Sequence, residues 1–122
     1  MKKVLFVEDN NALFHAYEEA LSQKNISILH AVTGQEGLDI VDKEKPELIV
    51  LDIMLPGGIS GFDVLEQLKA NPLTSYIPVF VLTNLDSEAQ VAKKIGAIDY
   101  KLKTDTSLDE IVAMVMKLLH VS

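Results

Sequence analysis

The chain has 122 residues, 48% of them hydrophobic, and a formal net charge of −7. This length suits one compact domain, 1–122, with a single core. The excess negative charge repels phosphate backbones and anionic lipid, so we expect no direct nucleic-acid binding. The chain has no cysteine, which excludes disulfides, thiol nucleophiles and thiolate zinc sites and is compatible with a cytoplasmic protein. No apolar run approaches the ~20 residues that span a bilayer, so we expect no membrane insertion.

Short apolar runs predict the strands: Val4–Val7, Ile26–Ala31, Leu48–Leu51, Pro78–Leu82 and Ala97–Leu102. The longer stretches between them carry apolar residues at helical spacing, which indicates alternating strands and helices. Leu48–Leu51 and Val79–Leu82 are almost continuously apolar, as is typical of strands covered on both faces in a parallel sheet. We therefore expect an α/β fold, a doubly wound three-layer sandwich with a five-stranded parallel sheet and five helices.

Capping-box patterns indicate where some of these helices begin. A serine or threonine is followed three residues later by Glu or Gln at Thr33, Ser87 and Ser107. Each of these residues is therefore predicted to open a helix.

Reactive side chains gather at the carboxyl ends of the predicted strands, where open α/β sheets bind ligands. They are Glu8 and Asp9 after the first strand, Asp52 after the third, Thr83 after the fourth and Lys103 after the fifth. Three neighbouring carboxylates repel one another, and either a raised pKa or a bound cation must relieve this. Oxygen ligands without His or Cys suit a hard ion. Mg²⁺ fits best, with Ca²⁺ as the alternative.

This set of groups predicts phosphoryl transfer. A carboxylate beside Mg²⁺ can attack phosphorus while the metal and an ammonium neutralise charge on the transferring oxygens. Asp52 is the candidate nucleophile. Lys101 and Lys103 share a strand face by the two-residue period, and nearness to the strand end favours Lys103.

Four segments carry a resemblance to a known family: VLFVEDN at 4–10, LIVLDIMLP at 48–56, PVFVLTN at 78–84 and GAIDYKLK at 96–103. With them, essentially the whole chain resembles the receiver domains of response regulators, the phosphoacceptor domains of two-component phosphorelay signalling. The resemblance implies a flavodoxin-like sheet with strand order 2-1-3-4-5. It also implies that Asp52 accepts a phosphoryl group from a histidine kinase or histidine phosphotransfer protein. Glu8 and Asp9 would hold Mg²⁺ together with Asp52 and the Met54 backbone carbonyl.

The resemblance also implies how such a switch would work. Thr83 would bind a phosphoryl oxygen, Lys103 would pair with its charge, and Tyr100 would swing inward as Thr83 moves. The surface of the fourth helix, fifth strand and fifth helix would carry the signal to an unknown output protein or domain, or join a homodimer. Lys93 and Lys94 fit a solvated face there equally well. The protein would not be an enzyme, apart from its own phosphoryl transfer and slow autodephosphorylation.

The chain departs from the family pattern in two loops. The loop 54–61 is one residue longer than usual, and Thr104 follows Lys103 where the family usually has proline. The Lys103–Thr104 bond should be either trans with a shifted loop or a strained cis bond. Met54 and Leu85 flank the route of attacking water and are both apolar, so we expect slow self-dephosphorylation.

Simpler interpretations stay open for single residues. Asp52 alone would more often be a helix cap or a turn residue, and Glu8 and Asp9 could cap the first helix. Tyr100 could be a plain core aromatic. The histidines show no metal-binding spacing, and we expect no site role for them: His15, His30 and His120.

Three other functions compete with the switch. A phosphatase of the haloacid dehalogenase type would need an acid–base Asp where Met54 stands. A flavodoxin-like flavin carrier would need a Ser/Thr/Gly-rich loop in place of Glu8-Asp9-Asn10. A receiver-like scaffold would never take phosphate, and Mg²⁺-dependent labelling would distinguish it.

Overall fold

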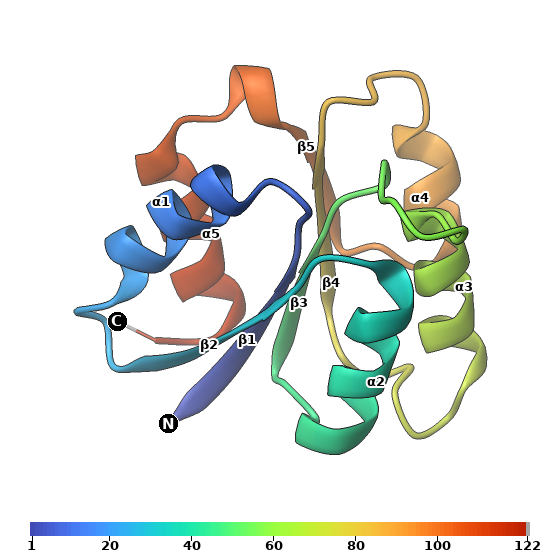
Figure 1. The fold of residues 1–122 in the computed structure, drawn as a ribbon, viewed down its shortest axis with the longest axis horizontal. Helices are drawn as coiled ribbons and strands as arrows, with labels where there is room; N and C mark the ends of the chain where they lie inside the picture. Colours follow the sequence, from blue (N-terminus) through green and yellow to red (C-terminus); the bar gives the residue numbers. More distant parts are fainter. Residues whose placement is uncertain (122) are drawn as a thin grey trace.

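A five-stranded parallel sheet forms the centre of the computed structural model, which describes residues 1–121 (Figure 1). The strands are β1 (Lys2–Val7), β2 (Ile26–Ala31), β3 (Leu48–Leu51), β4 (Val79–Thr83) and β5 (Asp99–Leu102). The helices are α1 (Asn11–Leu21), α2 (Gly34–Glu44), α3 (Gly61–Ala70), α4 (Ala89–Ile95) and α5 (Leu108–Leu118), with a short 3-10 helix, η1 (Lys103–Asp105). The strand order β2-β1-β3-β4-β5 confirms the predicted doubly wound fold.

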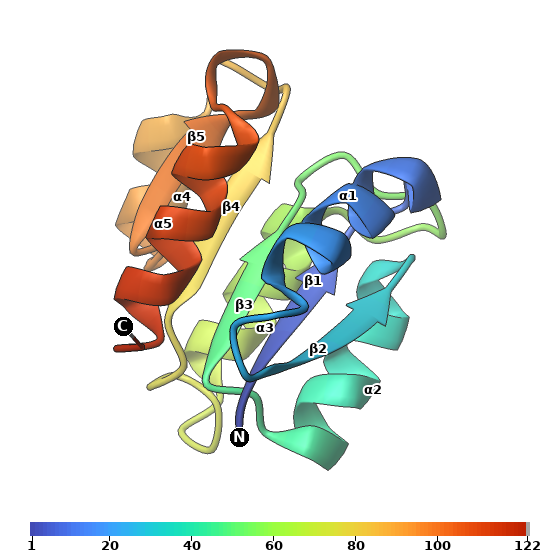
Figure 2. The same ribbon diagram turned by 90° about the vertical axis from the view of Figure 1, so that its left-hand side faces the viewer.

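Helices cover both faces of the sheet, and the two-residue alternation of strand side chains assigns each face its own core (Figures 1 and 2). In β1, Val4 and Phe6 pack with residues of α1 and α5. Leu5 and Val7 point the other way, into the core formed with α2, α3 and α4. Full burial of one such side chain contributes roughly 1.5–3 kcal/mol, so these two cores hold the strand ends in place.

Two of the three predicted helix starts are confirmed. The side chain of Thr33 caps α2, and Ser107 caps α5 in a reciprocal capping box. The prediction for Ser87 is wrong, because α4 begins at Ala89 with Glu88 at the cap position and no side-chain cap. Ser87 is exposed in a bend just before this seven-residue helix, so its capping-box sequence does not form a helix cap.

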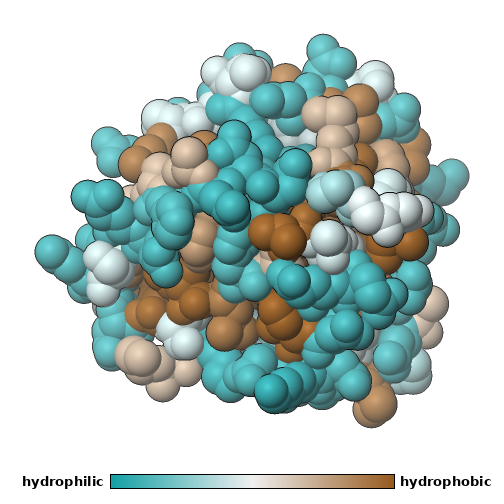
Figure 3. All heavy atoms as spheres, viewed as in Figure 1, coloured by the Kyte–Doolittle hydropathy of each residue, from teal (hydrophilic) through white to brown (hydrophobic). Residues whose placement is uncertain are grey.

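Residues 1–121 contain no cis peptide bond, so the trans alternative for Lys103–Thr104 is the observed one. The chain then turns through η1 before α5 begins. Hydrophilic side chains predominate on the molecular face seen in Figure 3, with hydrophobic ones showing as smaller patches between them. Among the helices in this described part of the chain, none is long and apolar enough to cross a membrane.

Candidate functional site

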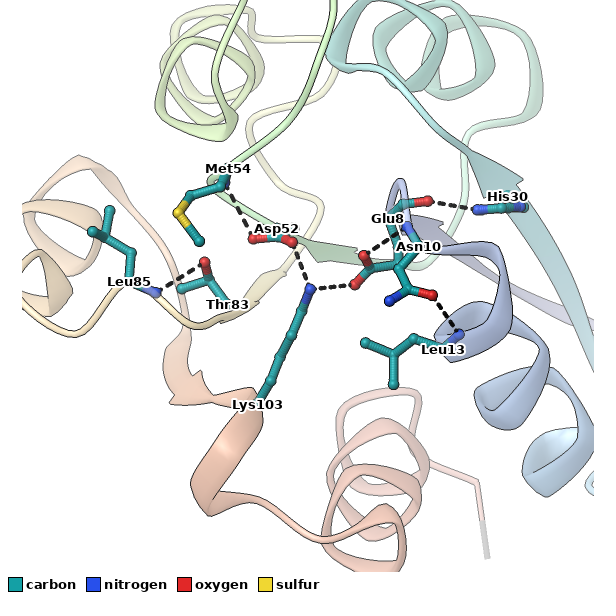
Figure 4. A network of polar contacts seen from close by, with 9 residues as sticks. All are labelled: Glu8, Asn10, Leu13, His30, Asp52, Met54, Thr83, Leu85 and Lys103. Atoms are coloured by element: carbon teal, nitrogen blue, oxygen red, sulfur yellow. Dashed lines mark hydrogen bonds and ion pairs between the residues drawn. The ribbon is translucent and has the colours of Figure 1, made fainter.

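The carboxyl ends of four neighbouring strands bring predicted side chains together, and Figure 4 shows Glu8, Asp52, Thr83 and Lys103 among them. Glu8 and Asp9 follow β1, Asp52 follows β3, Thr83 ends β4, and Lys103 opens η1 directly after β5. Glu8, Asp52 and Thr83 are buried, whereas Asp9 is exposed. Because the sheet is parallel, residues as far apart in the sequence as Glu8 and Lys103 meet at one edge.

The ammonium of Lys103 bridges two carboxylates at this edge. Its Nζ lies 2.6 Å from Asp52 Oδ2 and 2.7 Å from Glu8 Oε1. Burial lowers the pKa of Lys103, but its hydrogen bonds to Asp52 and Glu8 outweigh this and leave the pKa above its ordinary value. Lys101 is exposed. The structure thus resolves the choice between the two lysines in favour of Lys103.

Every polar group of Glu8 has a hydrogen-bond or ion-pair partner. Its N–H donates to the Ala31 carbonyl, Oε2 accepts from the Asn10 N–H at 3.1 Å, and Oε1 faces Lys103. Its carbonyl lies 2.7 Å from His30 Nε2. Burial raises the pKa of Glu8, and the hydrogen bonds from Lys103 and Asn10 offset this only in part.

The acidic groups have the chemistry of a hard-cation site. One carboxylate oxygen from each of Glu8, Asp9 and Asp52 can be chosen so that all three lie within 4.8 Å of one another. An all-oxygen donor set of this kind fits Mg²⁺. Met54 lies beside it, where its N–H donates to Asp52 Oδ1 at 3.2 Å.

Thr83 and Tyr100 are connected through one residue. The Leu85 N–H donates to Thr83 Oγ1 at 3.3 Å, and the Tyr100 hydroxyl donates to the Leu85 carbonyl. Burial raises the pKa of Tyr100, and the charges of Glu88 and Asp86 raise it further. Tyr100 is thus a buried ring with a bonded hydroxyl.

The long loop after Asp52 ends against the Asp52 backbone at Gly61. The Gly61 N–H donates to the Ile53 carbonyl at 2.8 Å. A methyl group on Gly61 would overlap the Asp52 carbonyl oxygen and lie 2.6 Å from Ile53 Cα. Only glycine lets the loop approach this closely.

Two further residues at the site were not predicted from the sequence. Asn10, and not Glu8 or Asp9, caps α1 by accepting from the Leu13 N–H at 3.0 Å. An Asn just before an amphipathic helix is a recognisable cap signal. His30 was assigned no role, and no spacing in the sequence connects it with Glu8.

The family model of the response regulator receiver domain matches residues 4–116. The chain belongs to this family. Among curated relatives, the receiver domain is 36% identical over 105 residues to the transcriptional regulatory protein AfsQ1 of Streptomyces coelicolor, covering 84% of the chain and 45% of AfsQ1. It is 32% identical over 105 residues to protein PilH of Pseudomonas aeruginosa, covering 84% of the chain and 86% of PilH. The chain therefore spans less than half the length of AfsQ1.

Solved receiver domains have the same fold. The BeF3-activated N-terminal receiver domain of Klebsiella pneumoniae RstA superposes with a TM-score of 0.86 at 29% identity, covering 97% of the chain and 98% of the RstA domain. The Mn²⁺-bound form of response regulator Rcp1 superposes with a TM-score of 0.80 at 26% identity, covering 97% and 91%.

Proposed function

We propose that this receiver domain is a phosphorylation-dependent signalling switch that accepts a phosphoryl group on Asp52 in the cytoplasm. The observation that carries the proposal is the setting of the Asp52 carboxylate, which lies between the Lys103 ammonium and the Met54 N–H at the edge of a parallel sheet. Thr83 is buried at the end of the neighbouring strand. These groups can orient a carboxylate and bind the oxygens of a transferred phosphoryl group.

In the proposed reaction, a carboxylate oxygen of Asp52 attacks the phosphorus of a phosphohistidine on a histidine kinase or phosphotransfer protein. The P–N bond breaks, the imidazole nitrogen keeps the electron pair and takes a proton, and an acyl phosphate forms. Lys103 pairs with the charge that arrives on the phosphoryl oxygens. The Thr83 hydroxyl donates to one of them.

The residues proposed to hold Mg²⁺ are Glu8, Asp9 and Asp52, with the Met54 carbonyl as the fourth protein ligand. Mg²⁺ held by these residues would neutralise charge on the transferring oxygens. The donor set supports the assignment, as do the Mn²⁺-bound form of Rcp1 and the BeF3-activated receiver domain of RstA among the structural relatives.

The contacts of Leu85 suggest how a phosphoryl group would be sensed. A phosphoryl oxygen at Asp52 would accept a hydrogen bond from the Thr83 hydroxyl and draw it away from the Leu85 N–H, which donates to the same Oγ1 in this structure. When Thr83 turns toward Asp52, Leu85 loses that bond and its carbonyl shifts away from Tyr100. Tyr100 is already turned inward in this structure, so the proposed movement of Leu85 would change the contact that holds its hydroxyl and, with it, the surface formed by α4, β5 and α5.

That surface is the proposed output face. Val91 of α4 and Ile98 before β5 are 46% and 53% exposed, which leaves apolar area for a partner. A hollow of about 250 Å³ is lined by residues of β5 and α5 and the turn between them: Lys101, Thr106, Glu110, Ala113, Met114 and Lys117. The partner is an output protein or domain, or a second copy of the chain. Sedimentation velocity with and without an acyl-phosphate donor would distinguish these two.

The decisive experiment incubates the protein with Mg²⁺ and a small acyl-phosphate donor and measures intact mass. We expect one added phosphoryl group on the unmodified protein and on the control Asp42→Asn, an exposed residue of α2. Asp52→Asn should remove the label. An unlabelled wild-type protein would favour the scaffold, and a label that survives in Asp52→Asn would place the phosphoryl group elsewhere.

The phosphatase alternative lacks its proton-transfer group. Two residues after Asp52 stands Met54, whose thioether can neither donate nor take a proton at neutral pH. We therefore propose that free phosphoesters are not turned over. Hydrolysis of p-nitrophenyl phosphate that depends on Asp52 would contradict this.

A further inference from the structure

The ring of His30 is held in a fixed plane beside the backbone of Glu8. His30 lies near the end of the edge strand β2 and pairs with Phe6 of β1. Its ring stacks on Phe14 of α1, with ring centroids 3.7 Å apart and planes 7° apart. Phe14 is itself buried, and its ring meets Phe6 edge-on at 6.0 Å. The aromatic packing between α1 and the sheet therefore sets the direction of the imidazole.

This direction points Nε2 at the backbone of the site. Nε2 lies 2.7 Å from the Glu8 carbonyl oxygen (Figure 4). A carbonyl oxygen only accepts hydrogen bonds, so Nε2 carries a hydrogen and donates. His30 thus makes a specific polar contact in addition to its packing.

The carbonyl that His30 binds belongs to the peptide between Glu8 and Asp9. This peptide is planar, so fixing its oxygen also restrains the backbone dihedrals on either side. The Glu8 carboxylate has further anchors in Asn10 and Lys103. The exposed Asp9 carboxylate makes no hydrogen bond with another residue in the range 1–121, so its direction depends on the backbone.

From this geometry we propose that His30 is a positioning residue, which orients the Glu8–Asp9 peptide so that both carboxylates face one divalent cation. The proposal rests on the proposed function, because it takes Glu8 and Asp9 as cation ligands. His30 contacts neither the cation nor the phosphoryl group. Groups that orient ligands in this way commonly change metal affinity about tenfold or more when they are lost.

Three substitutions separate the hydrogen bond from the packing. In His30→Gln the amide nitrogen can take the place of Nε2, so the donor is kept. His30→Asn is too short to reach, and His30→Phe keeps the stacked ring but has no donor. His15→Gln is the control, because His15 is exposed on α1 and its ring nitrogen pairs with Glu18 on the same helix.

The measurement is calorimetric titration of Mg²⁺ into each metal-free protein. We expect His30→Phe and His30→Asn to raise the dissociation constant about fivefold or more, with His30→Gln near the wild-type value and His15→Gln unchanged. The labelling rate from an acyl phosphate should fall in His30→Phe at low Mg²⁺ and recover at saturating Mg²⁺. Urea unfolding identifies any variant that binds poorly because it is unfolded.

Several results would overturn the proposal. If His30→Phe binds Mg²⁺ as tightly as the wild type, positioning fails and the proposed function stands. If His30→Gln folds but binds as weakly as His30→Phe, the donor is not what matters. Imidazole ¹⁵N shifts of the unmodified protein that place the hydrogen on Nδ1 alone would overturn it without any variant. A wild-type protein that neither binds Mg²⁺ nor takes the label overturns both proposals.

Discussion

The Tyr100 hydroxyl donates a hydrogen bond to the Leu85 carbonyl. The N–H of the same Leu85 donates to Thr83 Oγ1 at 3.3 Å. Leu85, a loop residue, therefore connects the Thr83 hydroxyl, next to the proposed phosphoacceptor Asp52, with the Tyr100 hydroxyl of β5 through its two backbone groups. A movement of Thr83 can reach Tyr100 through Leu85 alone.

Tyr100→Phe tests this connection. It removes the hydrogen bond to Leu85 and should lower the free energy of unfolding by about 1 kcal/mol. Labelling of Asp52 should persist, while the amide shift changes that phosphorylation causes in α4 should shrink. Urea unfolding and NMR spectra with and without the acyl phosphate measure the two effects. Tyr76→Phe, at a residue 69% exposed, should change neither.

Lys103→Met removes the positive charge between Glu8 and Asp52. The two buried carboxylates then face each other without a counter-charge, so we expect a loss of about 3 kcal/mol of unfolding free energy at neutral pH in chelator. The rate of labelling should fall as well. The matched change Lys101→Met, on the exposed face of β5, should stay within about 0.5 kcal/mol of wild type. Equal effects of the two changes would contradict the bridging role.

The pKa of Glu8 predicts a pH dependence. Burial raises this pKa above its ordinary value of 4.5, so just above that pH the folded chain keeps a proton that the unfolded chain releases. The free energy of unfolding therefore falls as the pH rises from about 4.5 to the pKa of Glu8 in the folded chain. The Gln side chain in Glu8→Gln cannot ionise, so this variant does not lose stability in that pH range. Its unfolding free energy relative to wild type should thus increase from about pH 4 to about pH 7 in chelator.

Glu66→Gln, at an exposed residue of α3, is the matched Glu-to-Gln control. If the difference in unfolding free energy between Glu8→Gln and wild type does not change with pH, the pKa of Glu8 is not raised by folding and the prediction is wrong.

Gly61→Ala should disturb the backbone of Asp52, the proposed phosphoacceptor. The added methyl group overlaps the Asp52 carbonyl, which should cost about 2–3 kcal/mol of stability and slow labelling. Gly58→Ala is the contrast, because Gly58 has a φ of 97° with nothing within 4 Å of an added methyl group. It should cost about 1–2 kcal/mol from the dihedral alone and leave labelling intact. Equal labelling by both variants would exclude the contact with Asp52.

Apolar side chains at Met54 and Leu85 predict a long-lived phosphoryl group, because neither can orient an attacking water. We expect a half-life of minutes or longer with Mg²⁺, followed by intact mass after removal of the donor. Met54→Glu places a carboxylate there and should speed the loss roughly tenfold to a hundredfold, whereas Met54→Leu should not change it. A wild-type half-life of seconds would rule the idea out.

The predicted features that the structure confirms depend on periodicity. Alternation in Val4–Val7 assigns side chains to two faces, and the continuous run Leu48–Leu51 marks a central strand. Once the strands are parallel, their carboxyl ends must share an edge, so the meeting of Asp52 with Lys103 follows without detailed geometry.

Features that depend on tertiary contacts were not predictable in this way. Ser87 has a capping pattern that the chain does not use, because α4 starts two residues later. His30 looks like any polar residue on an edge strand, and only the stacking on Phe14 directs it to Glu8. Leu85 contacts Thr83 and Tyr100 through its backbone N–H and carbonyl, so its side-chain type gives no sequence signal for these contacts.

The bridge from Lys103 to Glu8 and Asp52 means that the chain supplies its own counter-ion to the acidic site. A divalent cation would replace the Lys103 ammonium as the partner of the Glu8 carboxylate. It would not bind to carboxylates that lack a counter-charge. The free energy of cation binding is therefore smaller than at a site whose carboxylates have no ammonium partner within the chain. Occupancy would then follow the concentration of free Mg²⁺, which makes readiness for phosphorylation a property of the ionic surroundings as well as of the fold.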